Sequence, residues 1–193
     1  MAWILDAESF KEAKITLLLI FINITSYIVF NLILDIEYLL LLAQINSKVI
    51  LDFELWRLIT SMFLHADVIH LFSNVVALLI FGAAVENNFR RYQYLIIYFL
   101  SGLIGNIFSL ILLPLNVISL GASGAIFGLI GAVFIFFARE DQSFIFLGLI
   151  YILYFIIMSF APGINPWAHL FGLLGGVVFG YFFKHKKKYE DYY

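Results

Sequence analysis

Six long apolar segments constrain this chain more than any other feature of its sequence. They cover residues of about 15–34, 68–85, 92–113, 122–138, 144–160 and 166–183. A helix needs about 20 mostly apolar residues to cross the hydrocarbon core of a bilayer. Hydrophobic residues make up 64% of the chain and charged residues 12%, whereas a soluble domain has roughly 45–50% and about 25%. We therefore predict an all-α membrane protein with a bundle of six transmembrane helices.

No repeat, low-complexity tract or separate soluble domain interrupts these segments. We therefore expect a single membrane domain over residues 1–193, with a catalytic core of about 54–183 and a short charged tail at 184–193. Residues 1–14 mix acidic and basic side chains and contain no apolar run that ends in a small-residue cleavage site. We expect no cleavable signal peptide in this stretch.

The basic residues predict the orientation of the bundle. If the N-terminus lies inside, the inner flanks hold nine Lys and Arg residues, and the outer flanks hold only Lys48 and Arg57. Cytoplasmic flanks carry the excess of basic residues in membrane proteins. We therefore expect both termini in the cytoplasm and the long loop of residues 35–67 outside. Because this loop is rich in large apolar side chains, we expect it to pack on the bundle or to lie in the membrane interface.

The composition also excludes several kinds of site. The net charge of −2 indicates no nucleic-acid partner. The chain has no cysteine, which excludes disulfides, thiolate metal sites and a cysteine nucleophile. The sequence offers no convincing cluster of metal ligands, so we expect neither a metal nor another cofactor.

Four polar residues lie in or beside the apolar segments, near their predicted outer ends: His70, Asn74, Ser123 and His169. Polar and ionisable groups are costly in hydrocarbon and are functional candidates by default. His70 and Asn74 are four residues apart and share one helical face, where two donors could stabilise an oxyanion. On spacing alone, a hydrogen-bonded pair between helices is the more common use of such residues.

Ser123 lies in Gly121-Ala122-Ser123-Gly124, at the start of the fourth segment. Free backbone N–H groups and the positive dipole end of a helix favour an alkoxide there and offer donors to an oxyanion. The same small residues also fit a packing seam between membrane helices. The motif by itself favours the seam over catalysis.

His169 lies near the start of the sixth segment, close to the face that carries Gly172, Gly176 and Gly180. This glycine seam would let the sixth helix approach the fourth, and both seams begin at the polar residue. His169 would then lie beside Ser123, which is the arrangement that activates a hydroxyl nucleophile. A histidine bonded to a backbone carbonyl is an equal alternative.

Taken together, the four residues supply a nucleophile, a base and oxyanion donors, the set that acyl transfer requires. Only Asp67 and Glu86, of thirteen acidic residues, lie near the core segments. Glu86 is at the inner end of its helix, and Asp67 lies at the loop edge with no evident route to His169. We therefore predict a Ser–His dyad without a carboxylate.

Four motifs in this order resemble the rhomboid family of intramembrane serine proteases, over residues of about 54–180. They are the Trp56-Arg57 loop signature, the H-x₄-H-x₃-N pattern of His65, His70 and Asn74, the G-x-S-G motif at Ser123, and the A-H-x-x-G pattern that ends at Gly172.

The resemblance implies a role for each matching residue. Ser123 would be the nucleophile and His169 the general base, while His70, Asn74 and the backbone N–H of Ser123 would form the oxyanion hole. Glu86 would secure the inner ends of the second and third helices. Other residues would support the site: Trp56, Arg57, His65, Gly121, Gly124, Phe127 and Gly172. Phe127 stands where some members carry a tyrosine beneath the catalytic histidine, so the phenolic hydroxyl is absent here.

The resemblance further implies a serine endopeptidase that cleaves transmembrane segments of membrane proteins near the outer leaflet. Such a protein would be a multi-pass component of a cell membrane, and its small single-module form suits a prokaryotic plasma membrane. An inactive rhomboid-like protein that only binds membrane clients is one alternative, and the presence of both Ser123 and His169 argues against it. A small transporter with a histidine proton relay is another, but the half-repeats expected of it are not seen.

Overall fold

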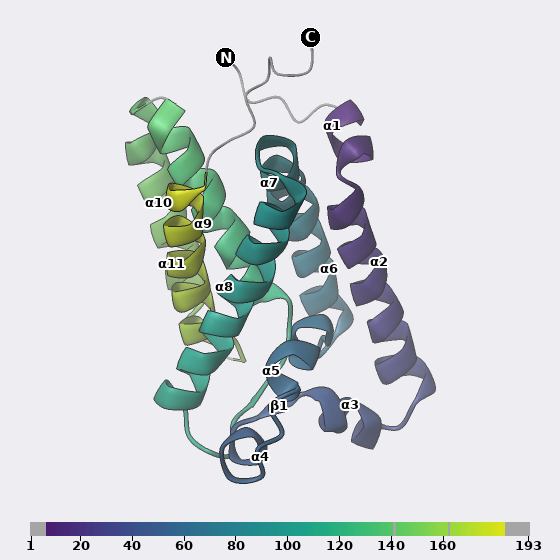
Figure 1. The fold of residues 1–193 in the computed structure, drawn as a ribbon. Helices are drawn as coiled ribbons and strands as arrows, with labels where there is room; N and C mark the ends of the chain where they lie inside the picture. Colours follow the sequence, from purple (N-terminus) through teal and green to yellow (C-terminus); the bar gives the residue numbers. More distant parts are fainter. Residues whose placement is uncertain (1–6, 141, 162, 184–193) are drawn as a thin grey trace.

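The computed structural model describes residues 7–140, 142–161 and 163–183. It is a bundle of helices, as the apolar segments predict (Figure 1). The expected tail at 184–193 lies outside the described residues. The elements in chain order are α1 (Ala7–Glu12), α2 (Lys14–Tyr27), η1 (Ile28–Ile33), α3 (Ile36–Leu42), β1 (Gln44–Ile45), α4 (Asn46–Leu51), α5 (Arg57–Thr60), η2 (Ser61–Phe63), α6 (Val68–Ala77), η3 (Leu78–Gly82), α7 (Ala83–Asn88), α8 (Arg91–Leu112), β2 (Ile118–Ser119), α9 (Ser123–Glu140), α10 (Ser143–Met158) and α11 (Pro166–Phe182).

Among the described residues, three helical stretches are long and apolar enough to cross a membrane: Lys14–Ile33, Val68–Asn88 and Arg91–Leu112. Three shorter apolar helices lie in the fourth, fifth and sixth predicted segments, at Ser123–Arg139, Gly148–Met158 and Pro166–Phe182. The prediction of an all-α protein with several apolar helices is confirmed. The number of crossings and the side of the termini stay predictions.

The second segment starts where predicted, at Val68, and extends a few residues past its approximate end. The helix does not stop at residue 85 but continues through the π-helical stretch η3 into α7 and ends at Asn88. Polar side chains are accommodated in this last turn, because the Asn88 amide donates to the Ala84 carbonyl at 2.8 Å. The Glu86 carboxylate is likewise bonded, to the start of α2.

The centre of the bundle consists of α8, α9 and α11, which make the most extensive contacts with one another. Their fully buried side chains include Tyr94, Tyr98 and Leu129. Figure 1 shows α9, α10 and α11 together on one side of the bundle and α2 on the other. Large apolar side chains such as Phe21 and Phe146 point outward and are exposed. A surface of this kind suits lipid as the surrounding solvent.

The loop of residues 35–67 is structured. Its short elements α3, β1, α4 and α5 lie at the end of the bundle opposite to α1 (Figure 1). β1 pairs antiparallel with β2, with Gln44 opposite Ser119, so the loop is tied to the segment just before Ser123. Met62 is buried in the bundle, whereas Phe53 is exposed. The loop therefore packs on the bundle, which is one of the two alternatives predicted.

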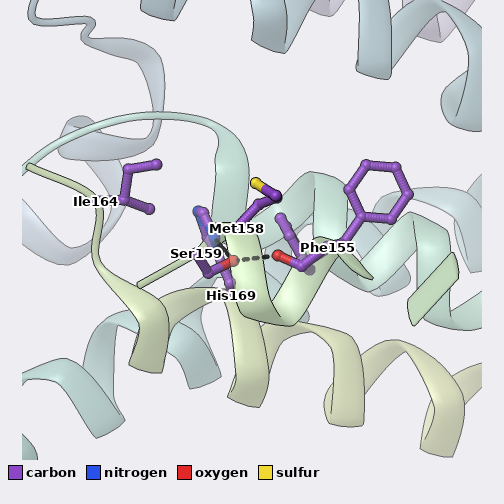
Figure 2. Close-up of a pocket in the computed structure, with 6 residues that line it drawn as sticks. Phe155, Met158, Ser159, Ile164 and His169 are labelled. Carbon is purple, nitrogen blue, oxygen red and sulfur yellow. Dashed lines mark hydrogen bonds between the residues drawn. The ribbon is translucent and has the colours of Figure 1, made fainter. Parts of the chain in front are cut away.

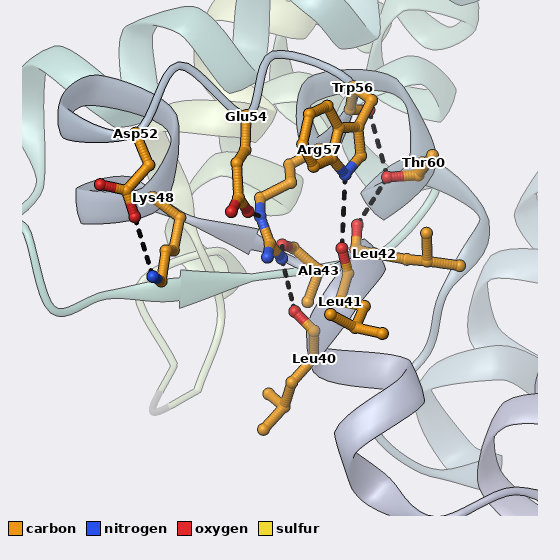
Figure 3. A network of polar contacts seen from close by, with 10 residues as sticks. All are labelled: Leu40, Leu41, Leu42, Ala43, Lys48, Asp52, Glu54, Trp56, Arg57 and Thr60. Atoms are coloured by element: carbon orange, nitrogen blue, oxygen red, sulfur yellow. Dashed lines mark hydrogen bonds and ion pairs between the residues drawn. The ribbon is translucent and has the colours of Figure 1, made fainter.

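Arg57 binds the parts of this loop to one another. Its guanidinium donates to the carbonyl oxygens of Leu40 and Ala43 and to the Glu54 carboxylate (Figure 3). The Arg57 side chain is buried, and a planar fork of N–H donors suits several acceptors at once. The neighbouring Trp56 is half exposed, and its indole donates to a backbone carbonyl of α3 at 3.4 Å. The sequence signature thus lies where it fixes α3 against α5.

Glu86 joins three helices at the end of the bundle that carries α1. Its carboxylate accepts hydrogen bonds from the backbone N–H groups of Ile15 and Thr16 and from the Thr16 hydroxyl, each at 2.9 Å. These N–H groups belong to the first turn of α2, where the helix itself offers no acceptor. The Thr16 hydroxyl also bonds the Tyr94 hydroxyl of α8 at 3.1 Å. Glu86 therefore binds the second segment directly to the first, and Thr16 extends this link to the third.

Candidate active site

The turn before α9 presents Ser123 as the first residue of the helix. Gly121 has a φ of +131°, a conformation that side-chain-bearing residues rarely adopt. The Gly121 N–H donates to the Ser61 carbonyl at 2.9 Å, which fixes the turn against the loop of residues 35–67. Ser123 is partly exposed, and the N–H groups of its first helical turn have no acceptor within the helix.

His70 of α6 lies against the same turn. A Cβ added at Gly121 would stand 2.9 Å from Nε2 of His70 and 3.6 Å from Oγ of Ser123. The imidazole and the hydroxyl therefore border one small space beside Gly121. Because a side chain at Gly121 would collide with the ring, the glycine is required here both for its backbone conformation and for its size.

The start of α11 positions His169. The Asn165 side chain caps this helix by accepting from the Ala168 N–H at 3.1 Å, and a proline occupies the first helical position. The Asn165 amide also donates to the hydroxyls of Ser109 and Ser119, at 2.8 and 3.0 Å. His169 therefore lies in the first turn of a helix whose start is tied to α8 and β2.

The backbones of α9 and α11 meet along the two glycine seams. A Cβ at Gly172 would overlap the carbonyl of Gly124, and one at Gly176 would overlap the carbonyl of Gly128. A Cβ at Gly124 would lie 3.3 Å from the Ala168 carbonyl oxygen. The predicted contact between the fourth and sixth segments is therefore confirmed, and it begins beside Ser123 and His169.

Phe127 supports the His169 ring. The two rings are stacked, with centroids 4.1 Å apart and planes 11° apart. Phe127 follows Ser123 by one helical turn, so both side chains lie on one face of α9. The imidazole therefore lies on the face of α9 that begins with Ser123. No direct hydrogen bond joins Ser123 to His169 among the described residues. In enzymes without substrate, the two groups of a catalytic hydrogen bond often lie far apart and come together only when substrate binds.

The other side of the His169 ring meets α10. Its Nδ1 is bonded to the Ser159 hydroxyl at 2.6 Å. The partner is thus a side-chain hydroxyl and not the backbone carbonyl that the sequence left as an alternative. A largely apolar pocket of about 160 Å³ lies beside this pair (Figure 2), lined by Phe127, Phe155, Met158, Ser159, Ile164 and His169.

The polar groups of His70 and Asn74 are oriented within α6. The Asn74 amide donates to the His70 carbonyl at 2.9 Å, and Nδ1 of His70 accepts a long bond of 3.5 Å from the Ala66 N–H. Within the described part of the chain, neither side chain bonds another helix, so the interhelical-pair interpretation finds no support. A neutral His70 that accepts at Nδ1 carries its proton on Nε2. That donor faces the space beside Gly121 and Ser123.

His65 lies behind His70, in the loop before α6. Its ring is fully buried and meets the His70 ring edge to face, with centroids 5.1 Å apart. Burial lowers the pKa of His65 to about 3, and the charge of His70 acts in the same direction. His65 is therefore neutral at neutral pH and packs against the candidate oxyanion donor.

Two residues of this site were missed by the sequence analysis. Asn165 could have been found, because Asn before Pro is a common helix start. Ser159 carries no local signal, since a lone serine near the end of an apolar helix does not indicate which side chain it meets. Only the packing of α10 against α11 brings it to His169.

The chain is similar in sequence to known proteins. The chain is 38% identical over 140 residues to the "Putative rhomboid protease YdcA" of Bacillus subtilis, and the match covers 70% of each chain. It is 34% identical over 161 residues to the "Rhomboid-like protease 3" of Toxoplasma gondii, covering 79% of this chain and 60% of that protein. It is also 33% identical over 129 residues to the "Inactive RHOMBOID-like protein 8" of Arabidopsis thaliana, covering 65% of this chain and 36% of the relative.

The chain thus spans most of the bacterial relative but only about a third to two thirds of the other two. Residues 52–186 match the family described as the Rhomboid domain. This region includes the Arg57 loop, the Ser123 turn and the helix that carries His169. Because the match covers more than half of its residues, the chain belongs to the rhomboid family.

Proposed function

We propose that this protein is an intramembrane serine endopeptidase that cleaves transmembrane segments of other membrane proteins. The observation that carries the proposal is the stack of His169 on Phe127, which lays an imidazole on the Ser123 face of α9. A base beside a hydroxyl at a helix start is the arrangement of an activated serine nucleophile. Family membership supports the same reaction class, while the name of one relative includes the word inactive.

The first chemical step forms an acyl-enzyme. His169 takes the proton of the Ser123 hydroxyl as Oγ attacks the substrate carbonyl carbon. The protonated imidazole then gives this proton to the departing amine, and the peptide bond breaks. Water attacks the remaining ester with the same base, and release of the new carboxyl group restores the Ser123 hydroxyl.

The reaction also requires stabilisation of the negatively charged oxygen that forms as Ser123 attacks the carbonyl. His70 offers Nε2–H beside Ser123, and the buried Asn74 amide keeps one N–H free of its bond to the His70 carbonyl. The backbone N–H of Ser123 is a third donor at the helix start. Removal of one such donor costs about 10²–10³-fold in kcat in serine proteases. We expect removal of the His70 imidazole to lower kcat by a factor in this range.

The bundle would hold the site below the outer membrane surface. We propose six crossings with both termini in the cytoplasm, because Lys and Arg concentrate on one set of flanks. Ser123 and His169 then lie near the outer ends of short helices, where water can reach them. A substrate segment would enter from the lipid and unwind near its outer end, and helix-breaking residues there would favour cleavage. We propose a prokaryotic plasma membrane as the location, and the 38% identical relative of Bacillus subtilis supports this.

A serine-reactive fluorophosphonate probe tests the assignment of the nucleophile. The purified wild-type protein should be labelled, and both Ser123→Ala and His169→Ala should abolish labelling. The alternative is a client-binding protein without proteolytic activity. Wild-type protein that binds transmembrane segments but resists the probe would favour this alternative and contradict the proposal.

A further inference from the structure

Ser159 connects the His169 ring to the end of α10. Its side chain is 2% exposed, and its Oγ makes two short bonds. One joins Oγ to the Phe155 carbonyl oxygen at 2.7 Å, and the other joins Oγ to Nδ1 of His169 at 2.6 Å. Figure 2 shows the three groups in this order at the edge of the pocket.

The count of hydrogens assigns a direction to both bonds. A serine hydroxyl has a single proton, and a carbonyl oxygen can only accept. The proton of Ser159 must therefore lie between Oγ and the Phe155 carbonyl, since two oxygens at 2.7 Å would otherwise repel each other. Oγ then accepts at its bond to His169, so Nδ1 carries the imidazole proton. In a neutral ring this leaves the lone pair on Nε2.

We propose that Ser159 is a positioning residue that holds His169 in the tautomer required of the general base. With Nδ1–H bonded to Ser159, Nε2 is the ring nitrogen left to take the Ser123 proton. Stacking on Phe127 fixes the plane of the ring, and the bond to Ser159 fixes its rotation within that plane. This inference rests on the proposed protease function.

The end of α10 then does what a carboxylate does in a catalytic triad. The last carbonyls of a helix carry partial negative charge, and a cation near them is stabilised. The Phe155 carbonyl belongs to the last turn of α10, and the Ser159 hydroxyl transmits its polarity to Nδ1. An imidazolium that forms at His169 during attack would be stabilised through this chain of two bonds. The arrangement explains how a dyad can work without an acidic partner.

Substitution at Ser159 tests this role. Ser159→Ala removes the acceptor of Nδ1–H, and we expect kcat to fall about 10- to 100-fold with little change in KM. Ser159→Thr keeps the hydroxyl and should restore most of the activity. Ser73→Ala is a matched control. Ser73 makes the same type of bond to the carbonyl four residues earlier, and within the described part of the chain it has no hydrogen bond to a histidine. It should retain wild-type kcat.

Nitrogen NMR of ¹⁵N-histidine-labelled protein in lipid gives a readout that does not depend on activity. The chain has four histidines, and His169→Gln assigns the signal of interest. We expect protonated Nδ1 and unprotonated Nε2 in the wild type, and a shift of the proton toward Nε2 in Ser159→Ala. A wild-type proton on Nε2, an unchanged tautomer in Ser159→Ala, or full activity of Ser159→Ala would each overturn the inference. If Ser123 proves not to be a nucleophile while the tautomer behaves as expected, the proposed function fails and the hydrogen-bond assignment stands.

Discussion

Gly172 lies where the backbones of α9 and α11 touch near the candidate dyad, so Gly172→Ala tests whether that contact sets the activity. The added Cβ would overlap the carbonyl oxygen and carbon of Gly124. These are backbone atoms of a buried helix and cannot rotate away as a side chain would. The two helices must therefore separate, and His169, three residues before Gly172, must move with α11.

The expected size of the effect follows from ordinary packing distances. Carbon atoms pack at about 3.5–4.0 Å, so relief of the overlap needs a shift of about 1 Å. Overpacking of this kind costs about 1–3 kcal/mol, and the better helix propensity of alanine offsets about 1 kcal/mol. A displacement of about 1 Å in a catalytic group can lower the rate about 10²-fold. We therefore expect Gly172→Ala to lose about 10²-fold in rate and at most about 2 kcal/mol in the free energy of unfolding.

The assay compares Gly172→Ala with Gly175→Ala on the same helix. At Gly175 the added Cβ would meet the Ser101 Oγ at 3.2 Å and the Ile104 Cδ1 at 3.3 Å, side-chain atoms that can give by a few tenths of an ångström, and the Ser101 Cα at 3.3 Å. We expect kcat/KM for a transmembrane substrate to fall about 100-fold in Gly172→Ala and to stay within about threefold of wild type in Gly175→Ala. Thermal unfolding in detergent should separate the two variants by about 2 kcal/mol or less.

Equal activity of the two alanine variants would refute this reasoning. It would mean that the Gly172–Gly124 contact does not set the position of His169 relative to Ser123. A loss of activity in Gly172→Ala that merely follows its loss of folded protein would also contradict the argument. The unfolding measurement in the same detergent distinguishes these results from a specific loss of rate.

Three further perturbations test the surrounding structure. Gly121→Ala adds a Cβ at a φ of +131°, and this Cβ would collide with the His70 ring. We expect the cleavage rate of the folded variant to fall at least about 100-fold, the loss expected when one oxyanion donor is removed. Arg57→Met leaves the partly buried Glu54 carboxylate and two carbonyls without their donor. It should destabilise the fold by about 3 kcal/mol in thermal unfolding, and an unchanged Tm would contradict this. His65 has a pKa of about 3 in the folded protein and 6.5 as a free side chain, so below pH 6.5 only the unfolded state binds a proton there and the protein loses stability as the pH falls. Between pH 7 and pH 5 this loss is about 2 kcal/mol, and His65→Gln should remove it. Parallel curves of stability against pH for the two proteins would contradict this role of His65.

Much of the helical framework could be predicted from the sequence, because apolar runs in a bilayer must form helices. The glycine seams also predicted which helices touch, since a residue without a side chain is what lets two backbones meet. Gly172 against Gly124 is an example. The paired strands β1 and β2 were not predicted, because two-residue strands leave no periodic pattern. The bonds of Glu86 to α2 were not predicted either, because a local pattern does not show which helix a carboxylate meets.

The candidate site divides in the same way. Ser123, His169 and His70 could be found as polar residues in apolar surroundings, and the proximity of Ser123 and His169 followed from the seams. Ser159 could not be found, because its role depends on the direction of one hydroxyl between two helices. The packing of His65 behind His70 likewise follows from the path of the loop before α6. Long-range contacts of single side chains are decided by packing and not by local pattern.

Cleavage of a model transmembrane substrate is the measurement that tests the central claim most directly. Purified wild-type protein, Ser123→Ala and His169→Ala would be reconstituted in liposomes with a substrate whose segment carries small, helix-breaking residues near its outer end. We predict one cut near that end by the wild type and none by either variant. Cleavage that persists in Ser123→Ala would contradict the assignment of the nucleophile, and an inert wild type with several such segments would contradict the proposed protease function.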